Sequence, residues 1–170
     1  MLVAQMESKS LQFEFRIKAI SSLEGKVGKA KVSFIKQCGD YESGRWGLAN
    51  EKLPKIYILR RGKEILYVGI TKMPLSKRFR YGLTASGKKG YHGYAWKELA
   101  KRGESGGIDL FVYLFNNAER TEAIEAEVVY LIRNKTGRWP KYQTEIHFHQ
   151  ADNKEKGIAH KIYNEILGKI

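Results

Sequence analysis

The chain contains one cysteine, Cys38, among its 170 residues. A single cysteine excludes an internal disulfide and a cysteine-rich zinc site, and we expect Cys38 to be a small buried hydrophobe. No apolar run approaches the roughly 20 residues that span a bilayer. Residues 1–10 lack the basic segment and apolar block of a signal peptide. We therefore expect a cytoplasmic protein with no membrane partner.

Common catalytic patterns are also lacking. The segment Gly87-Lys88-Lys89-Gly90 lacks the frame of a P-loop, which needs Gly-x4-Gly-Lys-Ser/Thr after a strand. No Ser-His-Asp or Cys-His arrangement stands out. What the chain has in excess is positive charge, with a net charge of +13 and a pI near 9.7. Residues 55–102 hold thirteen Lys or Arg and two Glu, so most of the excess lies in one third of the chain. Such a concentration indicates a phosphate-facing surface.

The hydrophobic content of 42% predicts a folded chain with a real core, and the length favours one domain. Alternation predicts a strand over 11–20, whereas 26–38 is mixed and Val27, Ala30 and Phe34 would suit a helix. A hairpin follows, with strands over 56–59 and 65–70 and a turn at 61–63. A short helix opens near Pro74.

The rest of the chain is predicted to alternate between helices and strands. The patterns predict a mobile basic loop over 82–93, a helix over 94–101, a strand over 109–115, a helix over 118–134, a strand over 144–149 and a helix over 152–167.

Two tyrosines lie on the predicted hairpin, ten residues apart. With a turn near Gly62, we expect Tyr57 and Tyr67 to lie opposite each other on one face. Lys55-Ile56-Tyr57 and Tyr67-Val68-Gly69 are followed by Arg78, eleven residues after Tyr67 and on the next predicted helix.

This order of motifs resembles the GIY-YIG nuclease superfamily over about residues 55–145. The resemblance further rests on Glu122-Ala123-x-x-x-Glu127 and on Pro140-Lys141-Tyr142-Gln143. It implies an α/β fold of the α+β type, with a small, mainly antiparallel three-stranded sheet flanked by helices. It also implies metal-dependent nuclease activity, with Arg78 as the catalytic arginine and Glu127 as the metal ligand.

The chain departs from the family pattern at three positions. Gln143 stands in place of the asparagine that helps hold the active site, and Lys55 replaces the usual glycine. Gly82 occupies a position where many relatives carry His or Tyr, and Tyr81, Arg80 or His92 could substitute for it.

Phosphodiester hydrolysis needs an activated water, charge relief and a stabilised leaving group. Glu127 borders the apolar stripe of its helix, whereas Glu119, Glu122 and Glu125 are expected to point toward solvent. A lone carboxylate suits a single Mg²⁺ or Mn²⁺ better than zinc.

Arg78 would clamp the phosphate, because its planar fork matches phosphate oxygens. We expect the anion of Tyr57 to be favoured by Lys72, Arg78 and the metal, so that Tyr57 takes a proton from water while Tyr67 orients the site. Lys72, His92 and Gln143 are the second choices for catalytic roles.

Double-stranded DNA is the expected partner. The residues expected to contact it are Lys77, Arg80, Tyr81, Lys88, Lys89 and Tyr91. We divide the chain into an N-terminal addition (1–50) that could bind DNA, a catalytic core (51–150) with a basic insertion (82–108), and a C-terminal helix packed on the core (151–170). His147 and His149 share one face of their predicted strand and could form a metal site with Asp152, although surface histidines or DNA contacts are the favoured alternatives.

The sequence thus predicts a metal-dependent DNA endonuclease, and its size favours a stand-alone, sequence-specific enzyme of the type II restriction kind. Two alternatives stay open: a structure-selective repair or recombination nuclease, and a catalytically inactive DNA-binding module of the same fold. The oligomeric state is open as well, and a homodimer would suit a symmetric target.

Overall fold

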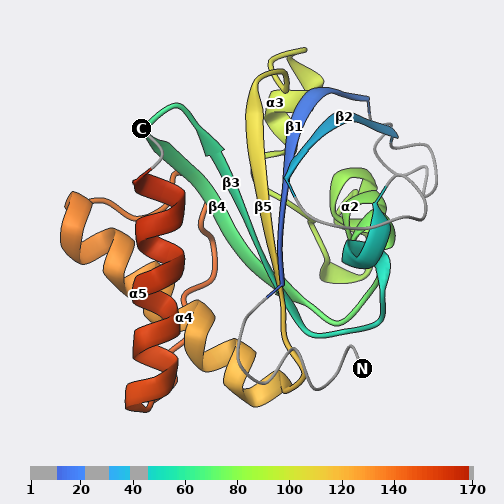
Figure 1. Ribbon diagram of the computed structural model, residues 1–170. Coiled ribbons are helices and arrows are strands. Elements are labelled where there is room, and N and C mark those ends of the chain that lie inside the picture. Colours follow the sequence, from blue (N-terminus) through green and yellow to red (C-terminus); the bar gives the residue numbers. More distant parts are fainter. Residues whose placement is uncertain (1–10, 22–30, 39–45, 169–170) are drawn as a thin grey trace.

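The computed structural model describes residues 11–21, 31–38 and 46–168. Its elements follow one another along the chain as Figure 1 shows. They are β1 (Leu11–Ser21), β2 (Lys31–Cys38), the 3-10 helix η1 (Gly47–Asn50), β3 (Lys55–Arg61), β4 (Glu64–Thr71), α2 (Leu75–Thr84), the 3-10 turn η2 (Lys88–Gly90), α3 (Lys97–Lys101), β5 (Ile108–Leu114), α4 (Ala118–Thr136) and α5 (Asn153–Leu167).

All five described strands form one antiparallel sheet in the order β2-β1-β5-β3-β4. The α+β class and the antiparallel sheet are confirmed, but the expected number of three strands is wrong. β1 pairs with β5 and buries Phe13, Phe15 and Ile17, so the described strands of residues 1–50 extend the same sheet. The segment for which the sequence signals are mixed forms the strand β2 in its described part. Val27 and Ala30 lie outside the described residues, as does the side chain of Cys38.

Each face of the sheet is covered by its own helices. One face packs against η1, α2 and α3, and the other packs against α4 and α5, which lie on the left of Figure 1. Side chains alternate along β3 to serve both cores: Tyr57 and Leu59 face α2, whereas Ile56 and Ile58 face α4. No helix within the described ranges is both long and apolar enough to cross a membrane.

The hairpin of β3 and β4 carries an irregular register. Tyr57 lies opposite Gly69 and Leu59 lies opposite Tyr67, with a register shift between Leu59 and Arg60. The two tyrosines therefore share one face, as predicted, but are diagonal neighbours and not direct partners. The extra residue of the bulge shifts every pair beyond it.

The ends of α4 and α5 follow known capping chemistry. Asn117 caps α4, which ends at Gly137 with a φ of 74°. Asp152 and Glu155 form a capping box on α5. The predicted helices over 118–134 and 152–167 are thus confirmed to within two residues, whereas the helix predicted over 94–101 begins only at Lys97.

The strand predicted over 144–149 is wrong. The preceding residues 141–143 already occupy the exposed edge of β4, because the amides of Lys141 and Tyr142 donate to the carbonyls of Ile65 and Leu66. The next residues are held on α4 by side chains, with His147 beside Glu125.

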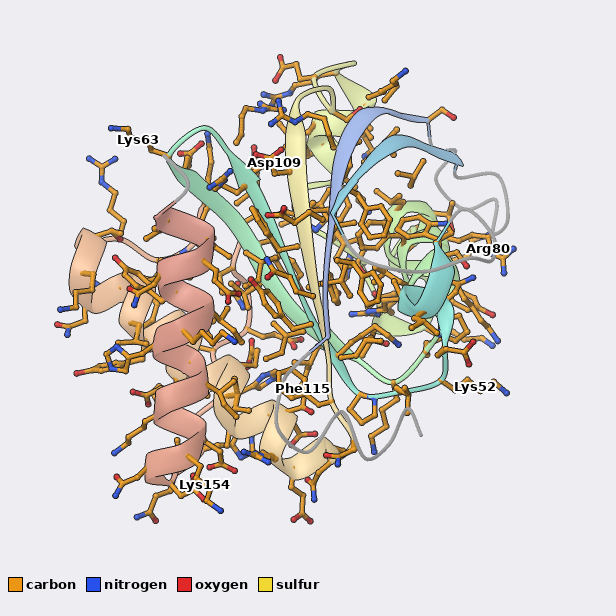
Figure 2. The ribbon with its side chains drawn as sticks, viewed as in Figure 1. Lys52, Lys63, Arg80, Asp109, Phe115 and Lys154 are labelled. Atoms are coloured by element: carbon orange, nitrogen blue, oxygen red, sulfur yellow. The ribbon has the colours of Figure 1, made fainter. Side chains whose placement is uncertain are left out.

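A buried carboxylate at the centre of the sheet pairs with arginines from the two neighbouring strands. Asp109 on β5 is 7% exposed and pairs with Arg60 on β3 at 2.9 Å and with Arg16 on β1 at 2.7 Å. Arg60 also donates to the carbonyl of Ile166 near the end of α5. Figure 2 labels Asp109 at this junction. One carboxylate therefore connects three strands, and through Arg60 it reaches the C-terminal helix.

Replacing Asp109 by alanine leaves the buried Arg60 guanidinium without its counter-charge. We expect Asp109→Ala to lower the free energy of unfolding by about 3–5 kcal/mol, because an unpaired buried charge is costly. Urea unfolding followed by fluorescence measures this. The matched control is Glu64→Ala, which breaks a half-exposed pair with Lys141 and should cost about 0–1 kcal/mol. Equal losses in both variants would contradict the role given to Asp109.

Candidate active site

A cluster of tyrosines lies on the α2 face of the sheet. Tyr57 on β3 is fully buried, and its hydroxyl lies 2.8 Å from the hydroxyl of Tyr94, which precedes α3. The ring of Tyr67 on β4 lies 5.9 Å from that of Tyr57 and 5.5 Å from that of Tyr94. Phe79 on α2 packs edge-on against Tyr57 and Tyr94. The two motif tyrosines thus belong to one packed aromatic group.

The glycine of the Tyr-Val-Gly motif has a steric role. A Cβ atom on Gly69 would lie 2.6 Å from the Tyr57 hydroxyl oxygen and 2.6 Å from the Tyr67 ring. Real Cβ atoms do not approach other atoms so closely. The missing side chain of Gly69 therefore lets the ring of Tyr57 lie flat across β4 beside Tyr67.

A second glycine makes room for Tyr94. A Cβ atom on Gly82 in α2 would overlap the Tyr94 ring, and the Tyr94 amide donates to the Gly82 carbonyl at 2.9 Å. The departure at Gly82 thus has a physical reason, because a ring from another segment fills the space above it. Tyr81 and Arg80 do not substitute there: both are exposed, and Arg80 points away from the body of the molecule in Figure 2.

Tyr94 belongs to the cluster although no motif of the sequence points to it, and Glu125, described below, is the second such residue. The only sequence signal for Tyr94 is the short stretch Gly93-Tyr94-Ala95-Trp96, in which Gly93 has a φ of 74° and Trp96 stacks on Tyr94 at 4.7 Å. The pattern indicates a buried aromatic after a tight turn, but it does not say which helix the ring meets.

Arg78 lies at the border of the tyrosine cluster. Its guanidinium donates to the Tyr91 hydroxyl at 2.8 Å and lies 5.2 Å from the centre of the Tyr94 ring. No carboxylate pairs with Arg78 in the part of the chain that the structure describes. Burial lowers the pKa of Arg78, but the surrounding hydroxyls of Tyr94, Tyr57 and Tyr91 outweigh this and raise it. The site therefore holds a permanent positive charge among neutral hydroxyls, which suits an anionic ligand.

The tyrosine hydroxyls are not activated as anions. Burial raises the pKa of Tyr57 well above its ordinary value, and the neighbouring Tyr94 raises it further, while Arg78 lowers it by less. Burial also raises the pKa of Tyr67 and of Tyr94. At Tyr57, burial thus outweighs the positive charge of Arg78, and the effect expected from a metal ion stays a prediction. Lys72 does not help, because it is exposed and lies in a pocket with Thr121 and Glu122.

Glu125 on α4 is a carboxylate whose charge acts on Tyr67. It is 2% exposed, so the expectation that it points toward solvent is wrong. The reason is that the segment after α4 folds back over this side of the helix and places His147 Nδ1 3.3 Å from the Glu125 carboxylate. Burial raises the pKa of Glu125 and the contact with His147 lowers it, with a net rise. The charge of Glu125 in turn adds to the raised pKa of Tyr67.

Glu127 lies on another side of α4. It is half-buried and lines a surface pocket with Tyr130 and Trp139. Of these two carboxylates of α4, Glu125 is the one whose charge acts on Tyr67 of the Tyr-Val-Gly motif.

Gln143 holds the motif from the edge of the sheet. Its side-chain oxygen accepts from the Val68 amide at 3.1 Å, and its side-chain nitrogen donates to the Val68 carbonyl at 3.1 Å. One amide thus satisfies both backbone groups of the central motif residue, as a neighbouring strand would. Gln143 therefore positions the backbone of the motif, and its side chain, which is longer than that of asparagine, reaches both backbone groups of Val68.

The histidines lie apart from the Tyr57–Tyr94 hydroxyl pair. The His92 ring lies against Gly87, and its carbonyl accepts from Lys97. His149 faces Glu122 at 3.7 Å, whereas Asp152 is used as the cap of α5. Among the described residues no group of three or more His, Cys, Asp or Glu is arranged to hold a metal ion.

The residues expected to contact DNA lie along α2 and the turn that follows it. Lys77, Arg80, Lys88 and Lys89 are all exposed, and Tyr81 and Tyr91 are among the exposed aromatics. Lys97 is buried and donates to the carbonyls of Ala85 and His92, which closes the loop that carries Tyr91. The basic surface is therefore attached to the tyrosine cluster through Tyr91 and Arg78.

Comparisons with protein-family models, with curated proteins and with solved structures give no match for this chain.

The steric role of Gly69 can be measured. We expect Gly69→Ala to lower the free energy of unfolding by about 1–3 kcal/mol, because the added methyl group must displace two packed rings. The control is Gly157→Ala in α5, where nothing lies within 4 Å and where alanine should add about 0.5–1 kcal/mol. Urea unfolding of both variants decides this. A Gly69→Ala protein as stable as the parent would show that the rings can move freely.

The raised tyrosine pKa values predict that the protein becomes less stable at alkaline pH. Tyr57, Tyr67, Tyr94 and Tyr113 all have raised pKa values, mainly through burial. Above the ordinary tyrosine pKa of about 10 the unfolded chain loses protons that the folded chain keeps. The free energy of unfolding must therefore fall as the pH rises through this range.

Ultraviolet absorbance of the phenolate measures this titration. We expect part of the phenolate absorbance to appear only when the protein unfolds at alkaline pH, and Tyr57→Phe and Tyr94→Phe should each reduce that part. If these variants instead reduced the absorbance change of the protein while it is still folded, the two tyrosines would titrate in the folded state, and the burial argument would be wrong.

Proposed function

We propose that this protein is a metal-dependent DNA endonuclease of the GIY-YIG type. The observation that carries the proposal is the placement of Arg78, a half-buried guanidinium without a carboxylate partner among the described residues, beside the tyrosine cluster. The charges of both Arg78 and Glu125 act on Tyr67: Arg78 lowers its pKa and Glu125 raises it. A guanidinium can relieve the charge on the phosphoryl oxygens, and a carboxylate can hold a metal ion that orients water.

Glu125 fits a single divalent cation. It is a buried carboxylate whose partner is His147, and burial raises its pKa in spite of that contact. A lone carboxylate oxygen suits Mg²⁺ or Mn²⁺, which keep several of their water ligands. When bound, such an ion supplies charge relief to the phosphoryl oxygens and orients water. Glu125 thereby takes the role that the sequence pattern assigned to Glu127.

The chain's own residues then divide the remaining tasks. Arg78 binds the non-bridging oxygens of the phosphate in a bidentate manner. Tyr57 and Tyr94 stay neutral and hold each other by their hydroxyl pair, which fixes the position of Tyr67. Tyr67 is only partly buried, so its hydroxyl is the motif group best placed to contact the attacking water.

The exposed basic residues of α2 and η2 supply the DNA-binding surface. A chain that carries this surface next to the site can act alone on double-stranded DNA, which favours a sequence-specific, restriction-like enzyme. Structure-selective cleavage is the second candidate.

The experiment is incubation with plasmid and phage-length DNA, first with Mg²⁺ or Mn²⁺ and then with chelator. Metal-dependent cleavage is expected, and Arg78→Ala should slow it about 10²- to 10³-fold, the usual cost of removing one charge-stabilising donor. Glu125→Gln should slow it at least as much, whereas its matched partner Glu127→Gln should leave it nearly intact. Tyr57→Phe with full turnover would remove Tyr57 from any proton-transfer role.

Discrete fragments would favour a restriction enzyme, and nicks or cuts at branches would favour the structure-selective alternative. Salt-sensitive binding without cleavage under either metal would mean that the protein is a binding module, and the proposed activity would be wrong.

A further inference from the structure

Exposed apolar side chains gather at one place outside the tyrosine cluster. Of the six large apolar side chains that are exposed in the described part of the chain, four line a single pocket of about 380 Å³. These are Tyr130 on α4 and Trp139, Ile146 and Phe148 on the segment after it, with Phe148 89% exposed. Exposed apolar surface that converges on a hollow indicates a binding site.

One lining residue of the pocket contacts Glu125, the proposed metal-binding carboxylate. His147 lines the pocket, and its Nδ1 atom lies 3.3 Å from the carboxylate of Glu125. A ligand in the pocket is therefore separated from the site of hydrolysis by one side chain.

Positive charge continues from the far side of the pocket. Trp139 lines both this pocket and a neighbouring one, whose other members include Lys63, Arg138 and Lys141, the last paired with Glu64 at 3.3 Å. The Arg133 guanidinium lies 5.7 Å from the centre of the Trp139 ring. Figure 2 shows Lys63 at the tip of the β3–β4 hairpin, projecting into solvent. An aromatic platform followed by cations is the arrangement that binds a single strand of nucleic acid through its bases and phosphates.

We propose that this pocket is a subsite for an unpaired nucleobase, which stacks on Trp139 and Phe148 while the phosphates that follow it meet Lys63, Arg138 and Lys141. The position of the subsite in the reaction rests on the proposed nuclease function. Bases inside a duplex are stacked on each other, so the pocket selects a nucleotide that is frayed, displaced or flipped out.

The test is the anisotropy of a fluorescein-labelled single-stranded oligonucleotide of about 12 nucleotides, a length that such sites accommodate. It is done in chelator, so that cleavage plays no part. Trp139→Leu and Phe148→Leu keep an apolar side chain but lose the ring, and each should weaken binding about 5- to 150-fold, the range for loss of one stacked base. The matched variants Trp139→Phe and Phe148→Tyr keep a ring and should bind nearly as the parent does. Affinity for a blunt-ended duplex should stay unchanged in all four.

Several outcomes would overturn the subsite. Leucine variants that bind the single strand as well as the parent would show that the rings do not stack on bases. Equal weakening toward the duplex would assign the surface to duplex binding. Dissociation of a parent dimer by the leucine variants, seen by sedimentation, would show that a second copy covers the pocket. If no metal supports cleavage but the leucine variants still lose single-strand binding, the subsite stands and the nuclease function falls.

Discussion

The rings of Tyr57 and Tyr94 fill the space that two glycines leave open, and the geometry of the candidate site depends on this packing. Gly69 lets Tyr57 lie across β4, and Gly82 lets Tyr94 lie against α2. The two hydroxyls then meet at 2.8 Å inside the protein. Because close-packed rings cannot shift independently, the strand pair, helix α2 and the loop before α3 are fixed relative to one another. Arg78 is held on the same cluster.

The exposed edge of β4 is the second constraint. An unpaired edge strand presents free amide and carbonyl groups that tend to pair with other chains. Here the segment after α4 covers the edge, and the side chain of Gln143 completes the pairing at Val68. The same segment continues to His147, which meets Glu125 on α4. One stretch of chain therefore protects the sheet edge and also contacts the buried Glu125.

Burial sets the charge states at the site. It keeps the hydroxyls of Tyr57, Tyr67 and Tyr94 neutral, since each pKa is raised. Arg78 stays charged because the surrounding hydroxyls outweigh the cost of its burial. The tyrosine cluster thus combines one cation with neutral hydroxyls, and in the proposed nuclease a tyrosine can act as a base only if its environment changes when substrate and metal ion bind.

The sequence alone determined the elements with strong local signals. Alternation and capping are local, so the hairpin strands, the first strand, α4 from Asn117 and α5 from Asp152 followed from it. The tertiary structure decided what depends on distant segments: that β1 joins the sheet, that Tyr94 fills the space over Gly82, and that Glu125 is the buried carboxylate. A helical pattern cannot show which side of α4 a later segment will cover, because that covering is set by where the chain returns after folding.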